Sequence, residues 1–186
     1  MNKNFRTIRS ACSRFPSRNK SGQALVEFSL VLLTLVLLAY CLVDFCVAIY
    51  EKQLLTNISR EAANLAARGG GPNQPQILPN ALAAIEMEST PLNLSNSTSG
   101  KIILTVVTNG NGNMFISQQV SAGHLSVSSK IGTGVGSISK TKLPNTNLVQ
   151  VGGSCYIAEV FYVYKPPAPL RIVGLSNVFY DVAYFQ

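Results

Sequence analysis

The residues that could carry out chemistry are few and scattered in this chain of 186 residues. The single histidine, His124, has no nucleophile or acid beside it in a recognisable pattern, so no hydrolytic site is predicted. The glycine-rich stretch Gly132–Lys140 lacks the Gly-Lys-Ser/Thr ending of a phosphate-binding loop and follows no strong strand pattern. We therefore expect an ordinary loop there, no catalytic residues, no cofactor and no enzyme activity.

The four cysteines form neither a metal-binding nor a disulfide pattern. Cys12 lies in the basic N-terminal segment, Cys41 and Cys46 lie in an apolar run, and Cys155 stands alone in the remainder. One histidine and no Cys-x-x-Cys pair predict no metal site. The part of the chain that follows the apolar run contains one cysteine, so no disulfide within that part is expected.

The net charge of +7 is concentrated at the N-terminus. Six basic residues and no acidic residue precede Gly22: Lys3, Arg6, Arg9, Arg14, Arg18 and Lys20. The remaining 15 − 6 = 9 basic residues are matched by 8 acidic ones, which leaves about +1 for the rest of the chain. A protein of this charge distribution has no basic face for a phosphate backbone, so nucleic acid is not an expected partner.

Glu27 is the residue whose type and position most need an explanation, because it opens a long apolar run. Phe28–Tyr50 is 23 residues long and is interrupted by a single charge at Asp44. A helix of that length spans roughly 34 Å, which is enough to cross a hydrocarbon core of about 30 Å. Because basic residues that flank a membrane helix stay on the cytoplasmic side, we expect the residues after Tyr50 to lie on the opposite side of the membrane.

The pattern of residues predicts that the helix continues beyond the membrane. Apolar residues in Glu51–Arg68 recur at helical spacing, which predicts an apolar stripe along one side. The stripe comprises Leu54, Leu55, Ile58, Ala62, Leu65 and Ala66. Gln23–Arg68 contains no proline or glycine and is predicted as one helix about 70 Å long, which Gly69-Gly70-Gly71-Pro72 ends.

A sheet is predicted after the long helix. Pro79–Glu88 could form a short second helix capped by Asn80. Four later segments have strand composition: Lys101–Val107, Met114–Val120, Cys155–Tyr164 and Val178–Phe185, with His124–Ser129 as a weaker fifth. The first two of them flank a hairpin-type turn at Asn109–Asn113. The fold class is therefore α+β, with the helix packed on one face of an antiparallel sheet of four or five strands.

The N-terminal residues together resemble the signature of type IV pilins and pseudopilins. In that superfamily, a membrane peptidase cuts a basic leader directly after a glycine, and the fifth residue of the mature chain is glutamate. The resemblance implies cleavage between Gly22 and Gln23, with Glu27 as that glutamate. It also implies that Glu27 and Phe28 take part in packing the helices of neighbouring subunits.

The stretch Ala24–Gly69 is similar to the TadE-like pseudopilins of tight-adherence (Tad/Flp) pili. The similarity rests on Glu27-Phe28, the leucine/valine run, Asp44-Phe45, Tyr50 and the Arg60-Glu61-Ala62-Ala63 segment. The sequence departs from the family at Cys46 and Ala62, where glycine is common, and at the bulky Gln23. It contains no Asp-x-Ser-x-Ser string, which the larger TadG-like proteins carry.

The resemblance implies a minor pilin or pseudopilin that takes part in pilus assembly. Its implied partners are a prepilin peptidase, other pilin-like subunits, the inner-membrane assembly platform and membrane lipid. The expected domains are a cleaved leader (1–22), a membrane helix (23–50), a periplasmic helix (51–68) and an exported α+β domain (69–186). The expected location is the bacterial inner membrane, single-pass, with incorporation into the extracellular pilus as one destination.

Two alternatives stay open at the level of sequence. Asp44 is either a second residue for contacts between subunits or a residue near the outer membrane interface. The chain as a whole is either a processed pilin-like subunit or an unprocessed, singly anchored periplasmic scaffold. The N-terminus of the protein isolated from cells distinguishes the last two.

Overall fold

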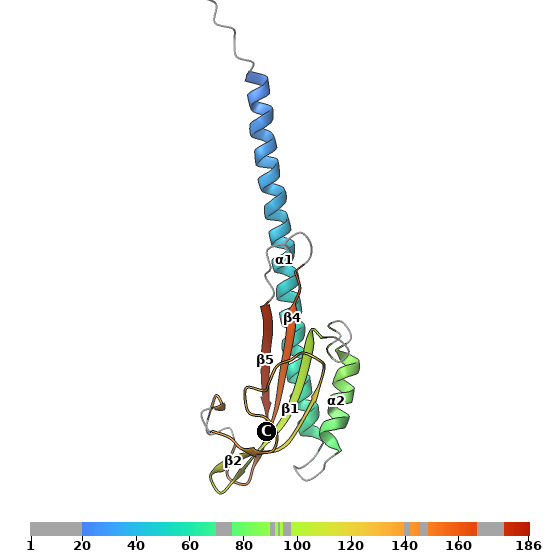
Figure 1. Cartoon of the computed structure of the whole chain (residues 1–186), viewed down its shortest axis with the longest axis vertical. Helices are drawn as coiled ribbons and strands as arrows, with labels where there is room; N and C mark the ends of the chain where they lie inside the picture. Colours follow the sequence, from blue (N-terminus) through green and yellow to red (C-terminus); the bar gives the residue numbers. More distant parts are fainter. Residues whose placement is uncertain are drawn as a thin grey trace, which may run out of the picture. The chain divides into compact units, whose positions relative to one another are not determined.

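The computed structural model describes residues 20–69, 76–89, 92, 94, 98–139, 142–145, 149–166 and 177–186. Residues 1–19 of the predicted leader lie outside the described residues, as do Gly70, Gly71 and Pro72 of the predicted helix stop. The elements in chain order are α1 (Lys20–Arg68), α2 (Ile77–Glu88), β1 (Gly100–Gly110), β2 (Asn113–Ala122), β3 (Gly136–Ser137), β4 (Ser154–Tyr164) and β5 (Asn177–Phe185) (Figure 1).

Two compact units divide the chain between Tyr40 and Cys41. The first unit contains the N-terminal part of α1. The second unit contains the remainder of α1 together with α2 and the sheet. The predicted α+β class, with a long N-terminal helix followed by an antiparallel sheet, is confirmed.

Helix α1 begins at Lys20, a few residues before the predicted start, and ends at Arg68 as predicted. A Cβ atom built on Gly69 would lie 2.0 Å from Cγ2 of Ile77, the first residue of α2. Glycine is therefore the residue that lets the end of α1 approach the start of α2 so closely. Helix α2 begins at Ile77, with Gln76 at the cap position and no side-chain cap bond. The predicted cap at Asn80 is wrong, because that residue already lies within the helix.

The sheet has five strands in the order β3-β2-β1-β4-β5, and all neighbouring pairs are antiparallel. The hairpin between β1 and β2 turns at Asn111 and Gly112, both of which have positive φ, at 51° and 86°. Positive φ at both central residues is typical of a type I′ turn and explains the Asn-Gly sequence. The amide of Gly112 donates to the side-chain oxygen of Asn109, over 3.0 Å, which fixes the turn further.

The predicted strand at His124–Ser129 is wrong. This segment is irregular and is fastened to the sheet by isolated bonds, such as Leu125 N donating to Gly100 O over 3.2 Å. The short strand β3 forms further along the same connection, where Phe115 and Ile116 of β2 pair with it. Strand composition alone did not distinguish these two parts of the connection, because neither is a long apolar run.

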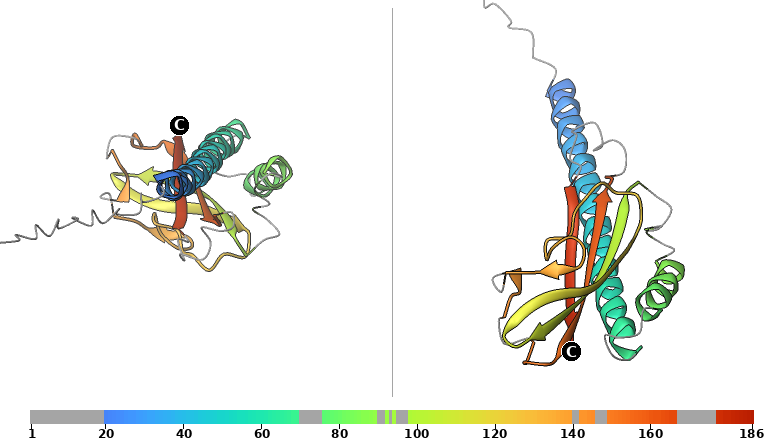
Figure 2. Two further views of the ribbon diagram at one scale, coloured as in Figure 1. Left: turned by 90° about the horizontal axis from the view of Figure 1, so that it is seen from above. Right: turned by 60° about the horizontal axis from the view of Figure 1, so that its bottom comes forward.

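The two helices cover one face of the sheet within the second unit (Figure 2). The core on this face contains buried side chains from α1, α2, β1 and β4. The buried residues of α1 are Leu55, Ile58, Ala62, Ala63 and Ala66; those of α2 are Leu78, Ala81, Leu82 and Ile85; and those of the strands are Ile102, Leu104, Val106, Tyr156, Ala158 and Val160. The predicted packing of the apolar stripe on the sheet is thus seen, although Leu54 and Leu65 are only partly buried.

The opposite face of the sheet has a second core, formed with the long connection from β2 to β4. Ile131, Leu143 and Val149 of that connection pack against strand residues that include Cys155 and Ile157. Because both faces are covered, β1 and β4 are buried along nearly their whole length and read as apolar runs instead of alternating ones.

Candidate functional site along helix α1

The N-terminal part of α1 exposes almost all of its apolar side chains. An 18-residue window within Gly22–Arg68 has a mean hydropathy of 2.6, and none of it is buried within the protein. Of the helices that the structure describes, this is the one that is long and apolar enough to cross a membrane. Exposing apolar surface to water costs about 25 cal/mol per Å², so this part of α1 would be strongly unfavourable in water. Its exposed apolar surface is consistent with a helix that is surrounded by lipid or by other helices.

Two hydroxyl groups inside this apolar part are satisfied within the helix itself. The Ser29 hydroxyl donates to the carbonyl of Val26 over 2.8 Å, and the Thr34 hydroxyl donates to that of Leu30 over 2.9 Å. Such bonds to the preceding turn leave neither of these two hydroxyls unpaired in a nonpolar surrounding. The helix can therefore lie in hydrocarbon without a cost from these two residues.

Glu27 is exposed, one helical turn after Gln23, and the two side chains are bonded to each other. The Gln23 amide Nε2 donates to Glu27 Oε1 over 3.0 Å. The carboxylate therefore points toward the N-terminal end of the helix. Phe28 beside it is exposed to 66%, so it too is available to a neighbouring molecule.

Gly22 lies inside α1, where its backbone does not have positive φ and a Cβ atom would meet nothing within 4 Å. A glycine inside a helix costs about 1 kcal/mol relative to alanine. Neither the packing nor the backbone of the described chain thus requires glycine at this position.

Asp44 has a partner within its own chain. The Tyr164 hydroxyl, at the end of β4, donates to the Asp44 carboxylate and also approaches the Asp44 carbonyl oxygen at 3.2 Å. Burial, followed by this bond to Asp44, raises the pKa of the Tyr164 hydroxyl well above its usual range. The geometry favours an anchor between α1 and β4 for Asp44, and its predicted role between subunits remains a prediction.

Three further residues of α1 make polar contacts with the last two strands. Lys52 Nζ lies 2.8 Å from Asp181 Oδ1 and also donates to the carbonyl of Tyr180 over 2.7 Å, while the Ser59 hydroxyl donates to Asp181 Oδ2 over 2.6 Å. Glu51 is paired with the Tyr162 hydroxyl, and partial burial raises the pKa of its carboxyl group. With Asp44, these residues form a polar edge of α1 that fixes the helix against β4 and β5.

The predicted Arg60-Glu61-Ala62-Ala63 segment divides into two pairs with different surroundings. Ala62 and Ala63 are 0% and 1% exposed and lie against the sheet, where a larger side chain would push the helix away. Arg60 is exposed, and both Arg60 and Glu61 line a groove between α1 and α2. The small residues therefore have a packing role, and the charged ones face outward.

The other residues considered from the sequence do not come together into a site. His124 is exposed in the irregular segment after β2. The described residues contain no group of three or more histidine, cysteine or acidic side chains placed to hold a metal ion. Cys155 is buried, and burial raises the pKa of its thiol from 9.0 to about 11, so it is not an activated nucleophile.

Comparison with known families locates the similarity in this same helix. Residues 22–64 match the family described as TadE-like protein. The chain is similar to TadE-like proteins over this region. The match begins at Gly22 and includes Glu27, Asp44, Arg60 and Glu61, so the predicted resemblance is confirmed and relates the chain to Tad pilus proteins. No curated protein and no solved structure matches the chain.

Glu159 is a buried carboxylate that sequence reasoning did not single out. It is 0% exposed, on the sheet face opposite α1, within an apolar strand. It accepts bonds from the Ser129 hydroxyl, from the Lys130 amide over 2.9 Å and from the Tyr180 hydroxyl over 3.1 Å. An acid in the middle of the otherwise apolar CYIAEVFYVY run was the available signal, because such a residue needs buried partners.

Proposed function

We propose that this chain is a minor pilin or pseudopilin that takes part in the assembly of a Tad/Flp-type pilus. The observation that carries the proposal is the TadE-like match, which begins at Gly22 and covers the helix that exposes its apolar side chains. In this proposal the leader is removed, α1 holds the subunit in the inner membrane, and the sheet domain is exported to the periplasm.

Gly22 supports cleavage of the leader. The chain accepts the helical cost of a glycine at a position where a Cβ atom would meet nothing. A requirement from outside the folded chain explains this choice, namely a prepilin peptidase whose site admits no side chain there. The new N-terminus is then the amine of Gln23.

Glu27 supports assembly through the helices. After cleavage, the charged amine of Gln23 lies one turn before the carboxylate of its own chain and can pair with the carboxylate of a neighbouring chain. At low dielectric a charge pair is directional, and leaving one partner unpaired is costly. Glu27 would thus define the stagger of neighbouring helices, while exposed side chains such as Phe28 provide contact area.

The contact between Asp44 and Tyr164 supports a shorter membrane-spanning part than the sequence predicts. In this proposal, a helix segment held against the sheet domain is outside the hydrocarbon, and the membrane-spanning part ends near Asp44 instead of at Tyr50. Gln23–Val43 contains 21 residues, or roughly 31 Å of helix, which still matches a core of about 30 Å. In this proposal the partners are the peptidase, other pilin-like subunits, the inner-membrane assembly platform and lipid.

The N-terminus of the chain tests the proposal. Mass spectrometry of the protein from membranes and from sheared filaments should find a chain that begins at Gln23. Gly22→Leu should block this processing, whereas Thr34→Leu, a matched change in the same helix, should leave it intact. A chain that keeps its leader at full abundance in both fractions would favour the singly anchored scaffold.

Glu27 is tested separately, because cleavage and assembly are different steps. Glu27→Gln keeps the shape of the side chain and removes its charge. We expect normal membrane levels and normal cleavage, but loss of co-purification with other pilin-like subunits. The free energy of association should weaken by about 3–5 kcal/mol if the pair is buried. Unchanged co-purification would show that Glu27 is only an interfacial residue.

A further inference from the structure

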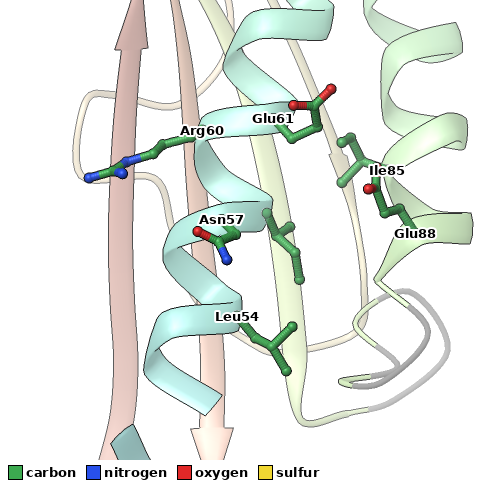
Figure 3. Close-up of a pocket in the computed structure, with 7 residues that line it drawn as sticks. Leu54, Asn57, Arg60, Glu61, Ile85 and Glu88 are labelled. Atoms are coloured by element: carbon green, nitrogen blue, oxygen red, sulfur yellow. The ribbon is translucent and has the colours of Figure 1, made fainter. Parts of the chain in front are cut away.

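A groove of about 510 Å³ lies between α1 and α2, on the outer side of the helix layer (Figure 3). Its walls include the aliphatic side chains of Leu54, Ile58 and Ile85. Carboxylates from both helices stand along it, Glu61 from α1 and Glu88 from α2. Asn57 and Arg60 of α1 line the groove as well, and the Arg60 side chain is turned away from α2 (Figure 3). The groove thus combines an apolar floor with two carboxylates toward α2 and one cation on the other side.

Neither of these two carboxylates forms an ion pair with a described residue. Among the residues that the structure describes, the one ion pair joins Lys52 and Asp181, on the β5 side of α1. Glu88 is exposed and Glu61 is half-buried, so both are open to a cation from another molecule. A partner for this groove should therefore present a basic side chain next to surface that can cover the aliphatic floor.

The same helix carries a matching cation on its other side. Arg60 is exposed and turned away from α2, as Figure 3 shows. Arg60 also borders a shallow surface formed with Gln53, Thr56 and Asn57, which has no acidic residue. Because Arg60 and Glu61 are adjacent in the sequence, they lie about 100° apart around the helix axis. Arg60 therefore stands at the edge of the groove that is farther from α2, and Glu61 stands at the edge that faces α2.

We propose that the groove binds α1 of a second copy of this chain, with the neighbour's Arg60 placed between Glu61 and Glu88. Guanidinium binds carboxylates with two parallel bonds, which makes the contact directional. Arg60 of one copy meets Glu61 and Glu88 of the next, so in a pair of copies one keeps a free groove and the other keeps a free Arg60. Such a contact between unlike surfaces continues into an open chain of subunits. This inference rests on the proposed function, since both require α1 helices of neighbouring copies to run side by side.

Charge exchange between two differently tagged full-length chains tests the contact. Chain one carries Arg60→Glu, and chain two carries Glu61→Arg with Glu88→Arg. The chains are co-expressed in the native host, solubilised in detergent and purified through one tag. Each variant should co-purify with a tagged copy of itself about tenfold less than the unmodified chain does. The mixture of the two variants should recover most of that loss, because every Arg60-to-groove contact again joins opposite charges.

Matched controls separate this contact from general charge effects. Lys142→Glu reverses an exposed cation on the connection from β2 to β4, and Glu86→Arg reverses an acid on α2 that does not line the groove. Neither should alter co-purification. A photo-crosslinker at Asn57 should join two copies of the chain in the unmodified protein and fail to do so with Arg60→Glu.

Three results would overturn the inference: full co-purification of Arg60→Glu with itself, no recovery in the mixture, or crosslinking from Asn57 to a different subunit only. If these occur while the chain begins at Gln23 and is found in filaments, the inference about the groove fails and the proposed function stands. If the chain keeps its leader and is absent from filaments, the proposed function fails.

Discussion

Removal of the Glu159 carboxylate should loosen the connection between β2 and β4 from the sheet. Glu159 accepts bonds from Ser129, Lys130 and Tyr180, and it is fully buried. In Glu159→Ala, the hydroxyls of Ser129 and Tyr180 can rotate toward other acceptors, but the backbone amide of Lys130 cannot. One unsatisfied buried donor costs about 1–3 kcal/mol, and the lost side-chain volume adds a cavity.

The expected loss in the free energy of unfolding is therefore about 3–5 kcal/mol for Glu159→Ala. Glu159→Gln keeps the volume and an acceptor oxygen for the Lys130 amide, so its loss should be about 1–2 kcal/mol. Thermal unfolding of the full-length chain in detergent, followed by circular dichroism, measures both. At about 2–4 °C for each kcal/mol, the alanine variant should melt roughly 6–20 °C lower.

Limited proteolysis identifies where the structure loosens. Lys130 also lies over the Tyr180 ring, with Nζ 3.4 Å from its centroid, so both ends of this contact depend on the position that Glu159 gives them. Cleavage after Lys130 should be faster in Glu159→Ala than in Glu159→Gln. If Glu159→Ala unfolds within about 1 kcal/mol of the unmodified chain, the bonds to Glu159 do not hold the connection and the reasoning is refuted.

Three further predictions follow from single residues. Burial raises the pKa of the Cys155 thiol from 9.0 to about 11, so its contribution to stability is complete below pH 9 and is lost as pH rises to 11. Between pH 9 and 11 the unmodified chain should therefore lose about 2–3 kcal/mol of its free energy of unfolding that Cys155→Ala does not lose. An identical fall in the free energy of unfolding over this pH range in both chains would contradict this prediction. Leu55→Ala should destabilise the sheet domain by about 2–5 kcal/mol in chemical denaturation, and Leu54→Ala by clearly less, because Leu55 is 0% exposed and Leu54 is only partly buried. Tyr164→Phe should cost about 1–2 kcal/mol, because the Asp44 carboxylate loses its donor, while the processed chain keeps the same N-terminal residue; a changed N-terminus would argue against an anchor.

The elements with strong local signals were predictable from the sequence. Helix α1 follows from the absence of proline and glycine between Gly22 and Gly69, and its membrane part follows from the length of the apolar run. The strands β1, β2, β4 and β5 follow from their β-branched and aromatic residues, and the hairpin follows from Asn111-Gly112. In each case, neighbours in the sequence determine the backbone.

What depends on distant residues was decided only by the tertiary structure. Asn80 has the side chain of a helix cap, yet it lies inside α2, which already begins at Ile77, where Gly69 at the end of α1 packs against it. His124–Ser129 has strand-like composition but makes only isolated bonds to the sheet, such as that from Leu125 N to Gly100 O, and pairing along a ladder determines whether a strand forms.

The candidate site divides in the same way. Gly22, Gln23 and Glu27 are recognisable from sequence because their spacing along one helix is itself the signal, and the TadE-like match covers them. The partner of Asp44 is 120 residues away in the chain, at Tyr164, and no pattern in the sequence joins them. The groove likewise needs Glu61 and Glu88 side by side, which packing of α1 and α2 on one sheet face brings about. Local spacing thus determines the helix and its end, and packing determines which of its charged residues are held within the chain and which remain free for a neighbour.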